Sequence, residues 1–334
     1  MNSKKNILTA ALIVVLSLAV IGFVYFSLMK QSEGQLENTM FYSMDTYIEA
    51  NGSNDARKTT RDVFDRLDSI FDFHDEQSEL SKLNKSGKAT VSDELLTAVN
   101  GVLALNKKYG GDADITVGAL TRLWDINGDS PKVPDDNSIK TALKTVGYSN
   151  IIVKGSEVTL ENGAQIDMGC AAKGAALDVI KAEYEKSGVE RGIVSAGGSS
   201  ILLYGEGKFN TGIQSPDDDS EIIGKIKTES GFISTSGGYH RYAEIDGKKY
   251  THIIDTKTGS PTETDLTSVT VYCQSGLDSD FLSTLIFVGG TEKIKDYIKS
   301  EDIQVLAIDK DKKIYKSEGL EFELTDESYS YADN

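Results

Sequence analysis

The sequence of 334 residues predicts an α+β fold, a single domain in which helices and antiparallel strands are mixed. The first observation is that apolar residues early in the chain, as at 63–71, recur with the spacing of a buried helix face. The second is that many later segments alternate apolar and polar residues around glycine turns, with helical stretches between them. No internal repeat or low-complexity linker divides the body of the chain, so one domain is expected.

The amino terminus carries an uncharged apolar stretch, 7–29, which can cross a hydrocarbon core of about 30 Å at about 1.5 Å per residue. Two lysines precede it, so the positive-inside rule places 1–6 in the cytoplasm. The prediction is a single-pass protein of the cell membrane, with a tether at 30–38 and an extracytoplasmic domain at 39–334. A cleaved signal peptide is the alternative, although the stretch exceeds the usual apolar region of about 7–15 residues and no clear A-x-A site follows it.

Helices are predicted in chain order from apolar spacing and from capping residues, at 63–71, 93–110, 140–146, 172–186, 279–287 and 292–299. The second has the clearest boundaries, because Ser92 is a typical N-cap and Gly110 a typical end. Acidic residues fill its first turn and lysines its last, as the helix dipole favours.

Strands are predicted where apolar and polar residues alternate. Two hairpins are expected, 151–153 with 157–160 around Gly155-Ser156, and 242–245 with 249–254 around Asp246-Gly247. Further strands are predicted at 192–195, 209–214, 267–273 and 303–308, the last followed by 313–316. Hairpins and helices in this order favour the α+β class over a regular parallel sheet.

Composition excludes several kinds of partner and site. The net charge is −17, which repels a phosphate backbone, so we expect no nucleic acid partner. Two cysteines and three scattered histidines supply no paired-cysteine zinc site, so a metal site in this chain would be made of oxygen ligands. The sequence contains no G-x-x-x-x-G-K-[ST] phosphate loop and no G-x-S-x-G elbow.

Small and polar residues gather where predicted elements begin or end. The segment Asp167–Gly174 runs a carboxylate, a glycine turn and Lys173 into the start of a helix, a layout that suits an anionic ligand, although an ordinary capped turn would look the same. Paired glycines in 195–200 and 234–238 allow close approach of a ligand or merely a flexible turn. His252 and Asp255 stand together at a strand end, where a lone histidine is more often structural than catalytic.

Asp280 and Thr284 are four residues apart and therefore share one face of the predicted helix. Hard oxygen donors with this spacing can hold Mg²⁺ together with a backbone carbonyl and phosphate oxygens. An N-cap aspartate beside a buried threonine is the structural alternative.

Taken together and in order, these segments resemble the ApbE family, the FAD:protein FMN transferases. The resemblance covers about 40–290 and is carried by Met44-Asp45-Thr46, Ser78–Asn84, Asp114–Leu120, Asp167–Gly174 with Asp178, Ala196-Gly197-Gly198, Gly212-Ile213-Gln214, Thr235-Ser236-Gly237, His252–Pro261 and Asp280–Thr284. Each block is weak alone, whereas the ordered set is specific. The resemblance implies a single ApbE-like, T-fold-related domain behind the transmembrane helix.

The family's activity implies Mg²⁺-dependent transfer of FMN from FAD to a threonine or serine hydroxyl of an extracytoplasmic flavoprotein with an FMN-binding domain. The product is a phosphoester, and AMP is released. By position, the resemblance implies metal ligands at Asp280, Ser283, Thr284 and the carbonyl of Cys170; FAD contacts at Met44, His74, Asp112, Ala113, Asp114, Asp167, Lys173 and Ile254; and proton transfer at His252 and Asp255. We expect Cys170 and Cys273 to be free thiols, because Cys170 lies within the metal segment.

Four residues depart from the family's usual pattern. Asp45 stands where the family usually has glycine, Ser283 where some members have a second aspartate, Ser199 where aspartate is usual, and Thr256 where proline is common. A metal ion would thus meet one carboxylate fewer. Two alternatives remain open: hydrolysis of FAD to FMN and AMP by the same chemistry, and a non-catalytic, membrane-tethered flavin carrier.

Overall fold

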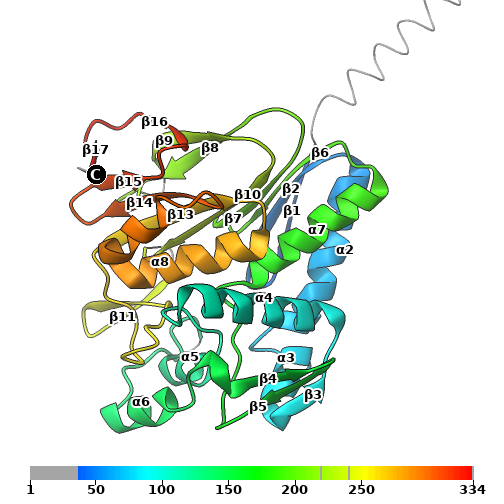
Figure 1. Ribbon diagram of the computed structural model, residues 1–334, viewed down its shortest axis with the longest axis vertical. Coiled ribbons are helices and arrows are strands. Elements are labelled where there is room, and N and C mark those ends of the chain that lie inside the picture. The colour runs from blue at the N-terminus through cyan, green and yellow to red at the C-terminus, as the bar shows by residue number, and fades with distance from the viewer. Residues whose placement is uncertain (1–36, 129, 219, 240, 333–334) are drawn as a thin grey trace, which may run out of the picture.

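The computed structural model describes residues 37–332, apart from 129, 219 and 240 (Figure 1). The predicted anchor at 7–29 and most of the predicted tether lie outside these residues. Within the described part of the chain, no helix has both the length and the apolar character needed to span a membrane.

A large mixed sheet forms the centre of the molecule. Its described strands follow the spatial order β1 (Glu37–Ser43), β2 (Thr46–Gly52), β6 (Arg191–Ala196), β7 (Ser200–Gly205), β10 (Gly231–Gly237), β13 (Leu266–Cys273), β14 (Gln304–Asp309), β15 (Lys313–Lys316) and β17 (Ser330–Tyr331). Neighbouring strands are antiparallel except for the parallel pair β15 and β17. The mixture of helices and antiparallel strands confirms the predicted α+β class.

Three long helices cover one face of this sheet: α2 (Asn54–Phe71), α7 (Ala172–Ser187) and α8 (Gly276–Tyr297) (Figure 1). Ser53 is the N-cap of α2, and its hydroxyl accepts a hydrogen bond from the Ala56 amide at 3.2 Å. In the apolar face predicted from the sequence, Phe64 and Leu67 are fully buried in the main core, and Ile70 packs against it partly buried. Burial of this face, together with the cap, fixes α2 against the sheet.

The opposite face of the sheet is covered over its central and far strands by a smaller sheet of β8 (Phe209–Gln214), β9 (Ile222–Thr228) and β16 (Glu321–Leu324). A second core lies between the two sheets, where Ile226 packs among Leu203, Ile233 and Leu306. In the described chain this covering layer does not reach the β1–β2 end, where large apolar side chains are exposed.

The remaining elements lie below the sheet in Figure 1 and are inserted mainly between β2 and β6. They are α3 (Glu79–Ser86), β3 (Lys88–Thr90), α4 (Asp93–Tyr109), α5 (Gly118–Trp124), α6 (Asp136–Leu143), the 3₁₀ turn η1 (Tyr148–Asn150), β4 (Ile151–Lys154), β5 (Glu157–Leu160) and the separate hairpin β11 (Tyr242–Ile245) and β12 (Lys248–Thr251). The two predicted hairpins are confirmed, as is the N-cap of α4 at Ser92.

Several predicted boundaries were wrong. The helix expected at 140–146 is α6, which begins earlier because Asp135 caps the amides of the next turn. The strand expected to continue to Ile254 ends at Thr251. By contrast, the two helices expected at 279–287 and 292–299 are confirmed as the two parts of α8, which meet at a kink where Gly290 has non-helical backbone angles. The elements that were not predicted are the helices α3 and α5 and the strands β1, β2, β3, β7, β9, β10, β16 and β17. Cys170 and Cys273 are free thiols, as expected.

Candidate active site

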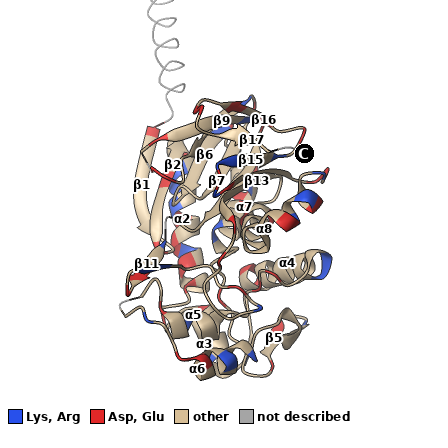
Figure 2. Ribbon diagram, turned by 90° about the vertical axis from the view of Figure 1, so that its left-hand side faces the viewer, with Lys and Arg blue, Asp and Glu red and all other residues tan. Residues whose placement is uncertain are grey.

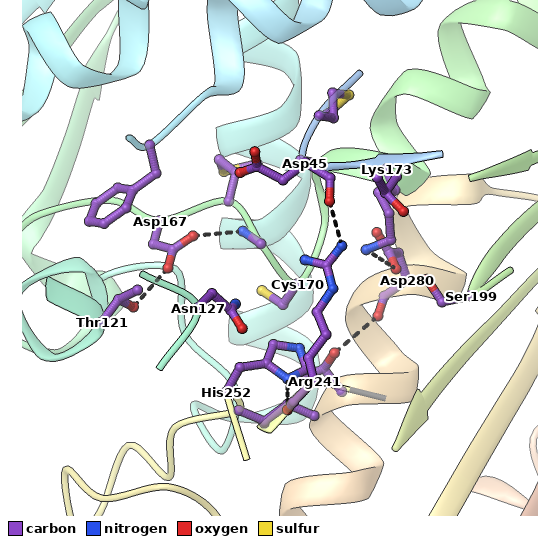
Figure 3. A pocket seen from close by; sticks show the side chains of 18 of the residues that line it. Asp45, Thr121, Asn127, Asp167, Cys170, Lys173, Ser199, Arg241, His252 and Asp280 are labelled. Carbon is purple, nitrogen blue, oxygen red and sulfur yellow. Dashed lines mark hydrogen bonds and ion pairs between the residues drawn. The ribbon is translucent and has the colours of Figure 1, made fainter. Parts of the chain in front are cut away.

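A cleft of about 410 Å³ lies where the ends of these elements meet, a size typical of small-molecule sites (Figure 3). Its walls come from the β1–β2 turn, the end of α2, the segment 113–114, the start of α7, the end of β10, the segment 252–254 and the start of α8. Residues more than 200 positions apart in the sequence therefore line one cavity.

Helices α7 and α8 cap each other at the floor of this cleft. Asp178 of α7 accepts hydrogen bonds from the amides of Gly276 and Leu277 at 2.7 and 2.8 Å, in the first turn of α8. In return, Asp280 of α8 accepts one from the amide of Gly174 at 2.9 Å, in the first turn of α7. Both carboxylates satisfy helix N-terminal amides that the helix itself leaves without a partner.

This exchange requires the two backbones to come unusually close. A Cβ built on Gly174 would lie 2.1 Å from the carbonyl oxygen of Gly276, so neither position has room for a side chain. The two glycines thereby bring Asp280 to the start of α7, beside Lys173.

Asp280 is buried and is the centre of a polar cluster. Its Oδ1 accepts a hydrogen bond from the hydroxyl of Ser200 at 2.9 Å and lies 3.6 Å from the ammonium of Lys173. Thr284, one turn later, lines the cleft, and its hydroxyl lies 3.0 Å from that of Ser236 on β10. The cluster therefore presents a carboxylate, hydroxyls and an ammonium to the same part of the cleft (Figure 3).

The loop before α7 is held by its own aspartate. Asp167 accepts hydrogen bonds from the Gly169 amide at 2.9 Å and from the Thr121 hydroxyl at 2.7 Å. Burial raises the pKa of the Cys170 thiol well above its ordinary range, and the carboxylates of Asp167, Asp280 and Asp114 raise it further. A thiolate is thus disfavoured at Cys170, first by burial and then by the neighbouring carboxylates.

His252 and Arg241 line the opposite side of the cleft. The carbonyl of Arg241 lies 3.0 Å from Nδ1 of His252 and also accepts a hydrogen bond from the His252 backbone amide at 3.2 Å. A carbonyl only accepts, so this contact places a proton on Nδ1 and leaves the lone pair of the neutral ring on Nε2. The guanidinium of Arg241 donates to the carbonyl of Asp45 at 2.9 Å and so spans the cleft to the β1–β2 turn (Figure 3).

The β1–β2 turn has an uncommon backbone. Both of its central residues have positive φ, 50° at Met44 and 55° at Asp45, which fits a tight hairpin turn of type I′. The Met44 amide donates to Asp68 of α2 at 2.9 Å, which holds the turn against that helix. Asp45 thus occupies a left-handed position, the conformation that glycine adopts at least cost.

The pKa values of two neighbouring aspartates, Asp112 and Asp114, are shifted in opposite directions. Burial raises the pKa of Asp114, only partly offset by hydrogen bonds from Thr116 and Tyr148. Burial also acts to raise the pKa of Asp112, but Lys257 and Lys293, with ammonium nitrogens at 2.8 and 3.0 Å, outweigh burial and lower it. The buried Asp112 carboxylate thus binds two more exposed lysines and joins three segments of the chain.

Most residues that the sequence predicted for the site lie together. The cleft is lined by Met44, His74, Ala113, Asp114, Asp167, Cys170, Lys173, His252, Ile254, Asp280 and Thr284. Three others lie outside its lining. Asp112 is bound by its two lysines, Asp255 accepts from the Lys257 amide at 2.7 Å, and the hydroxyl of Ser283 is buried against Ser236 at 2.8 Å.

Sequence reasoning did not assign several residues that line the cleft, among them Asp68, Thr121, Arg241 and Ser236. Ser236 lies in a segment that was singled out, but Asp68 and Arg241 carry no local signal, because only the tertiary fold turns them toward the cavity. Among the residues that the structure describes, no three His, Cys, Asp or Glu side chains converge as a metal site. A metal ion here would depend on hydroxyl, carbonyl and substrate oxygens in addition to Asp280.

Comparison with known proteins agrees with this geometry. The family model described as "ApbE family" matches residues 40–307. Two proteins named "FAD:protein FMN transferase" are similar: one from Escherichia coli K12 is 29% identical, covering 85% of each chain, and one from Vibrio cholerae is 30% identical, covering 78% of this chain and 82% of the other.

Solved structures give the same result. The crystal structure of the ApbE protein from Thermotoga maritima superposes with a TM-score of 0.79 at 28% identity, covering 85% of this chain and 97% of that one. The structure entitled "Flavin Transferase ApbE from Vibrio cholerae" superposes with a TM-score of 0.75 at 26% identity, with the same coverage. The family model spans most of the chain, and the single mixed α+β domain matches these structures; the chain therefore belongs to the ApbE family.

Proposed function

We propose that this protein is an FAD:protein FMN transferase that moves FMN from FAD to a threonine or serine hydroxyl of an extracytoplasmic flavoprotein. The observation that carries the proposal is the cleft itself. One side presents Asp280, Thr284 and Lys173 at a helix N-terminus, which suits a phosphate group and a cation. The facing side presents His252, with its ring oriented by the Arg241 carbonyl, which suits proton transfer.

The charges of the cleft favour a cation-dependent reaction. Its lining contains six aspartates, namely Asp45, Asp68, Asp72, Asp114, Asp167 and Asp280, against one lysine and one arginine. The pyrophosphate of FAD is itself anionic and would be repelled by this surface. Mg²⁺ fits the donor set, since Asp280 and Thr284 offer the hard oxygens that it prefers, and the Cys170 backbone also borders the cleft. When bound, Mg²⁺ would supply positive charge beside the phosphate oxygens.

The protein's own residues account for the other requirements of the reaction. Nε2 of His252 takes the proton of the acceptor hydroxyl, and the freed oxygen attacks the phosphorus of the FMN half. The bond from that phosphorus to the oxygen of the AMP half breaks, the new phosphoester forms, and AMP leaves with the bridging oxygen. Lys173 and the first turn of α7 stabilise the charge on the phosphates, while Asp167 and Asp114 fix the loops around the substrate.

The location of the reaction follows from the amino terminus. The apolar stretch at 7–29 and the preceding lysines support a single membrane-spanning anchor with the domain outside the cytoplasm. The acceptor would then be another extracytoplasmic protein, reached without release of the enzyme from the membrane.

The test uses the full chain in detergent with FAD, Mg²⁺ and a purified FMN-binding domain. We expect release of AMP and covalent flavin fluorescence on the denatured acceptor, both abolished by a chelator and by Asp280→Ala. Asp311→Ala, which removes an exposed carboxylate from a surface turn, is the matched control and should retain activity. AMP release without covalent flavin would indicate a hydrolase instead, and FAD binding with neither product would indicate a carrier.

A further inference from the structure

An exposed apolar face lies beside the cleft, on the outer side of the β1–β2 hairpin. Met40 and Tyr42 of β1 and Tyr47 of β2 are 61%, 61% and 65% exposed. They are three of the seven large apolar side chains found exposed in the described chain, and we call them the hairpin face. The two tyrosines are cross-strand partners and pack edge to face, with ring centroids 5.5 Å apart.

The exposure of the hairpin face follows from the layers of the fold. Alternate residues of the hairpin, such as Phe41 and Ile48, point inward and are buried against α2. The small sheet of β8, β9 and β16 covers the outer side of the large sheet elsewhere but leaves β1 and β2 bare, at the edge seen in Figure 2. Aromatic side chains therefore stand in solvent on an edge hairpin.

The three side chains of the hairpin face are uncharged, although the chain as a whole is strongly acidic. Glu49 is the charged neighbour on the same side, and its carboxylate accepts a hydrogen bond from Asn38 at 2.7 Å. Glu37, at the start of β1, forms an ion pair with Arg57. Tyrosine and methionine with few unpaired charges make up the composition that is enriched at the centres of protein interfaces.

The hairpin face is continuous with the rim of the cleft. The turn that joins its two strands, Met44–Thr46, lines the cleft, and at about 3.4 Å per residue Tyr42 lies roughly 7 Å and Met40 roughly 14 Å from that turn. A typical protein interface buries about 800 Å² on each partner, equivalent to a disc of roughly 16 Å radius. An interface of this radius that includes the β1–β2 turn is therefore large enough to reach these side chains.

We propose that the hairpin face is the docking surface for the folded flavin acceptor protein. This inference rests on the proposed function, which requires a macromolecular substrate to reach the cleft. Docking on Tyr42 and Tyr47 would position the acceptor as a body, while the cleft binds FAD. Substitutions on the hairpin face should thus raise the KM for the acceptor and leave FAD binding unchanged.

The experiment compares the full chain with the double variant Tyr42→Thr/Tyr47→Thr, in which threonine keeps a strand-forming residue at both exposed positions. Tyr331→Thr is the matched control, because Tyr331 is 46% exposed on β17 at the opposite edge of the same sheet. For the double variant we expect the Kd and the KM for a purified FMN-binding domain to rise about tenfold or more. Its kcat, its Kd for FAD and its Tm should stay at the wild-type values, as should every value for the control.

Unchanged acceptor affinity in the double variant would overturn the inference. So would loss of vesicle binding in place of acceptor binding, which would make the hairpin face a lipid contact. A wild-type dimer that the double substitution converts to a monomer would assign it to a second copy of the chain. Direct binding to the acceptor needs no turnover, so it tests the docking surface even if the chain transfers no flavin and the proposed function fails.

Discussion

Gly174→Ala tests the contact on which the site is built. The new Cβ would lie 2.1 Å from the carbonyl oxygen of Gly276 and 2.7 Å from Cβ of Asp280, closer than the 3.0 Å below which real Cβ contacts are essentially never found. Helices α7 and α8 must therefore separate by about 1 Å to relieve a backbone contact that no rotamer change can avoid.

The cost can be worked out from what this movement disturbs. Overpacking of a close contact costs about 1–3 kcal/mol, and the hydrogen bond from the Gly174 amide to Asp280, now 2.9 Å, contributes about 1.5–3 kcal/mol because its acceptor is charged. Together these give a loss of about 2.5–6 kcal/mol, which corresponds to a fall in Tm of roughly 10 °C for a domain of this size. In the cleft, a 1 Å displacement of a positioned group can lower the rate about 100-fold.

Thermal unfolding, FAD binding by flavin fluorescence and AMP release would be measured on the same preparations. Gly111→Ala is the control, because its Cβ would meet only Tyr148 at an ordinary 3.7 Å and should change stability by less than about 0.5 kcal/mol. If Gly174→Ala unfolded within 2 °C of the wild type, about a fifth of the expected fall in Tm, and bound FAD equally well, the close approach of α7 and α8 would be refuted.

Three further predictions concern titration and proton transfer. Asp112 has a lowered pKa in the fold, so its contribution should be complete above its unfolded pKa of about 4 and be lost as the pH falls through the lower folded value. Asp112→Asn should therefore cost most at neutral pH and least near pH 3 in urea unfolding; a constant difference would contradict this. Burial raises the pKa of the Cys273 thiol to about 12 and that of Cys170 further, so both should resist iodoacetamide at pH 8 until denaturant is added, as followed by mass spectrometry. His252→Gln should lower flavin transfer by about 10²–10⁴-fold with FAD affinity retained, and equal loss of both would assign His252 to binding.

Local sequence patterns predicted correctly those features that depend only on residues a few positions apart. The apolar spacing of α2 matches its buried face, and the four-residue separation of Asp280 and Thr284 does place both on the cleft. The same spacing rule did not exclude the neighbouring Ser283. Its hydroxyl contacts the same Ser236 hydroxyl as that of Thr284, but Ser283 is fully buried and does not line the cleft.

Long-range pairing accounts for what the sequence did not predict. Strand β10, GFISTSG, is buried along most of its length between β7 and β13, so it has no alternation of apolar and polar residues to detect. Strand β2 pairs with β6 across more than 130 residues, a distance that no local pattern reports. The role of Arg241 as a bridge to Asp45 depends on both of these regions being in place.

The reciprocal capping of α7 and α8 links the two halves of the proposed chemistry. Lys173 and the first turn of α7 would bind phosphate, whereas Asp280 and Thr284 of α8 would hold the cation. Since the Asp280 carboxylate also binds the Gly174 amide, its distance from the phosphate-binding turn is fixed by the same contact that packs the helices. Phosphate and cation sites therefore cannot move independently, and loosening this contact should weaken the binding of FAD and of Mg²⁺ together.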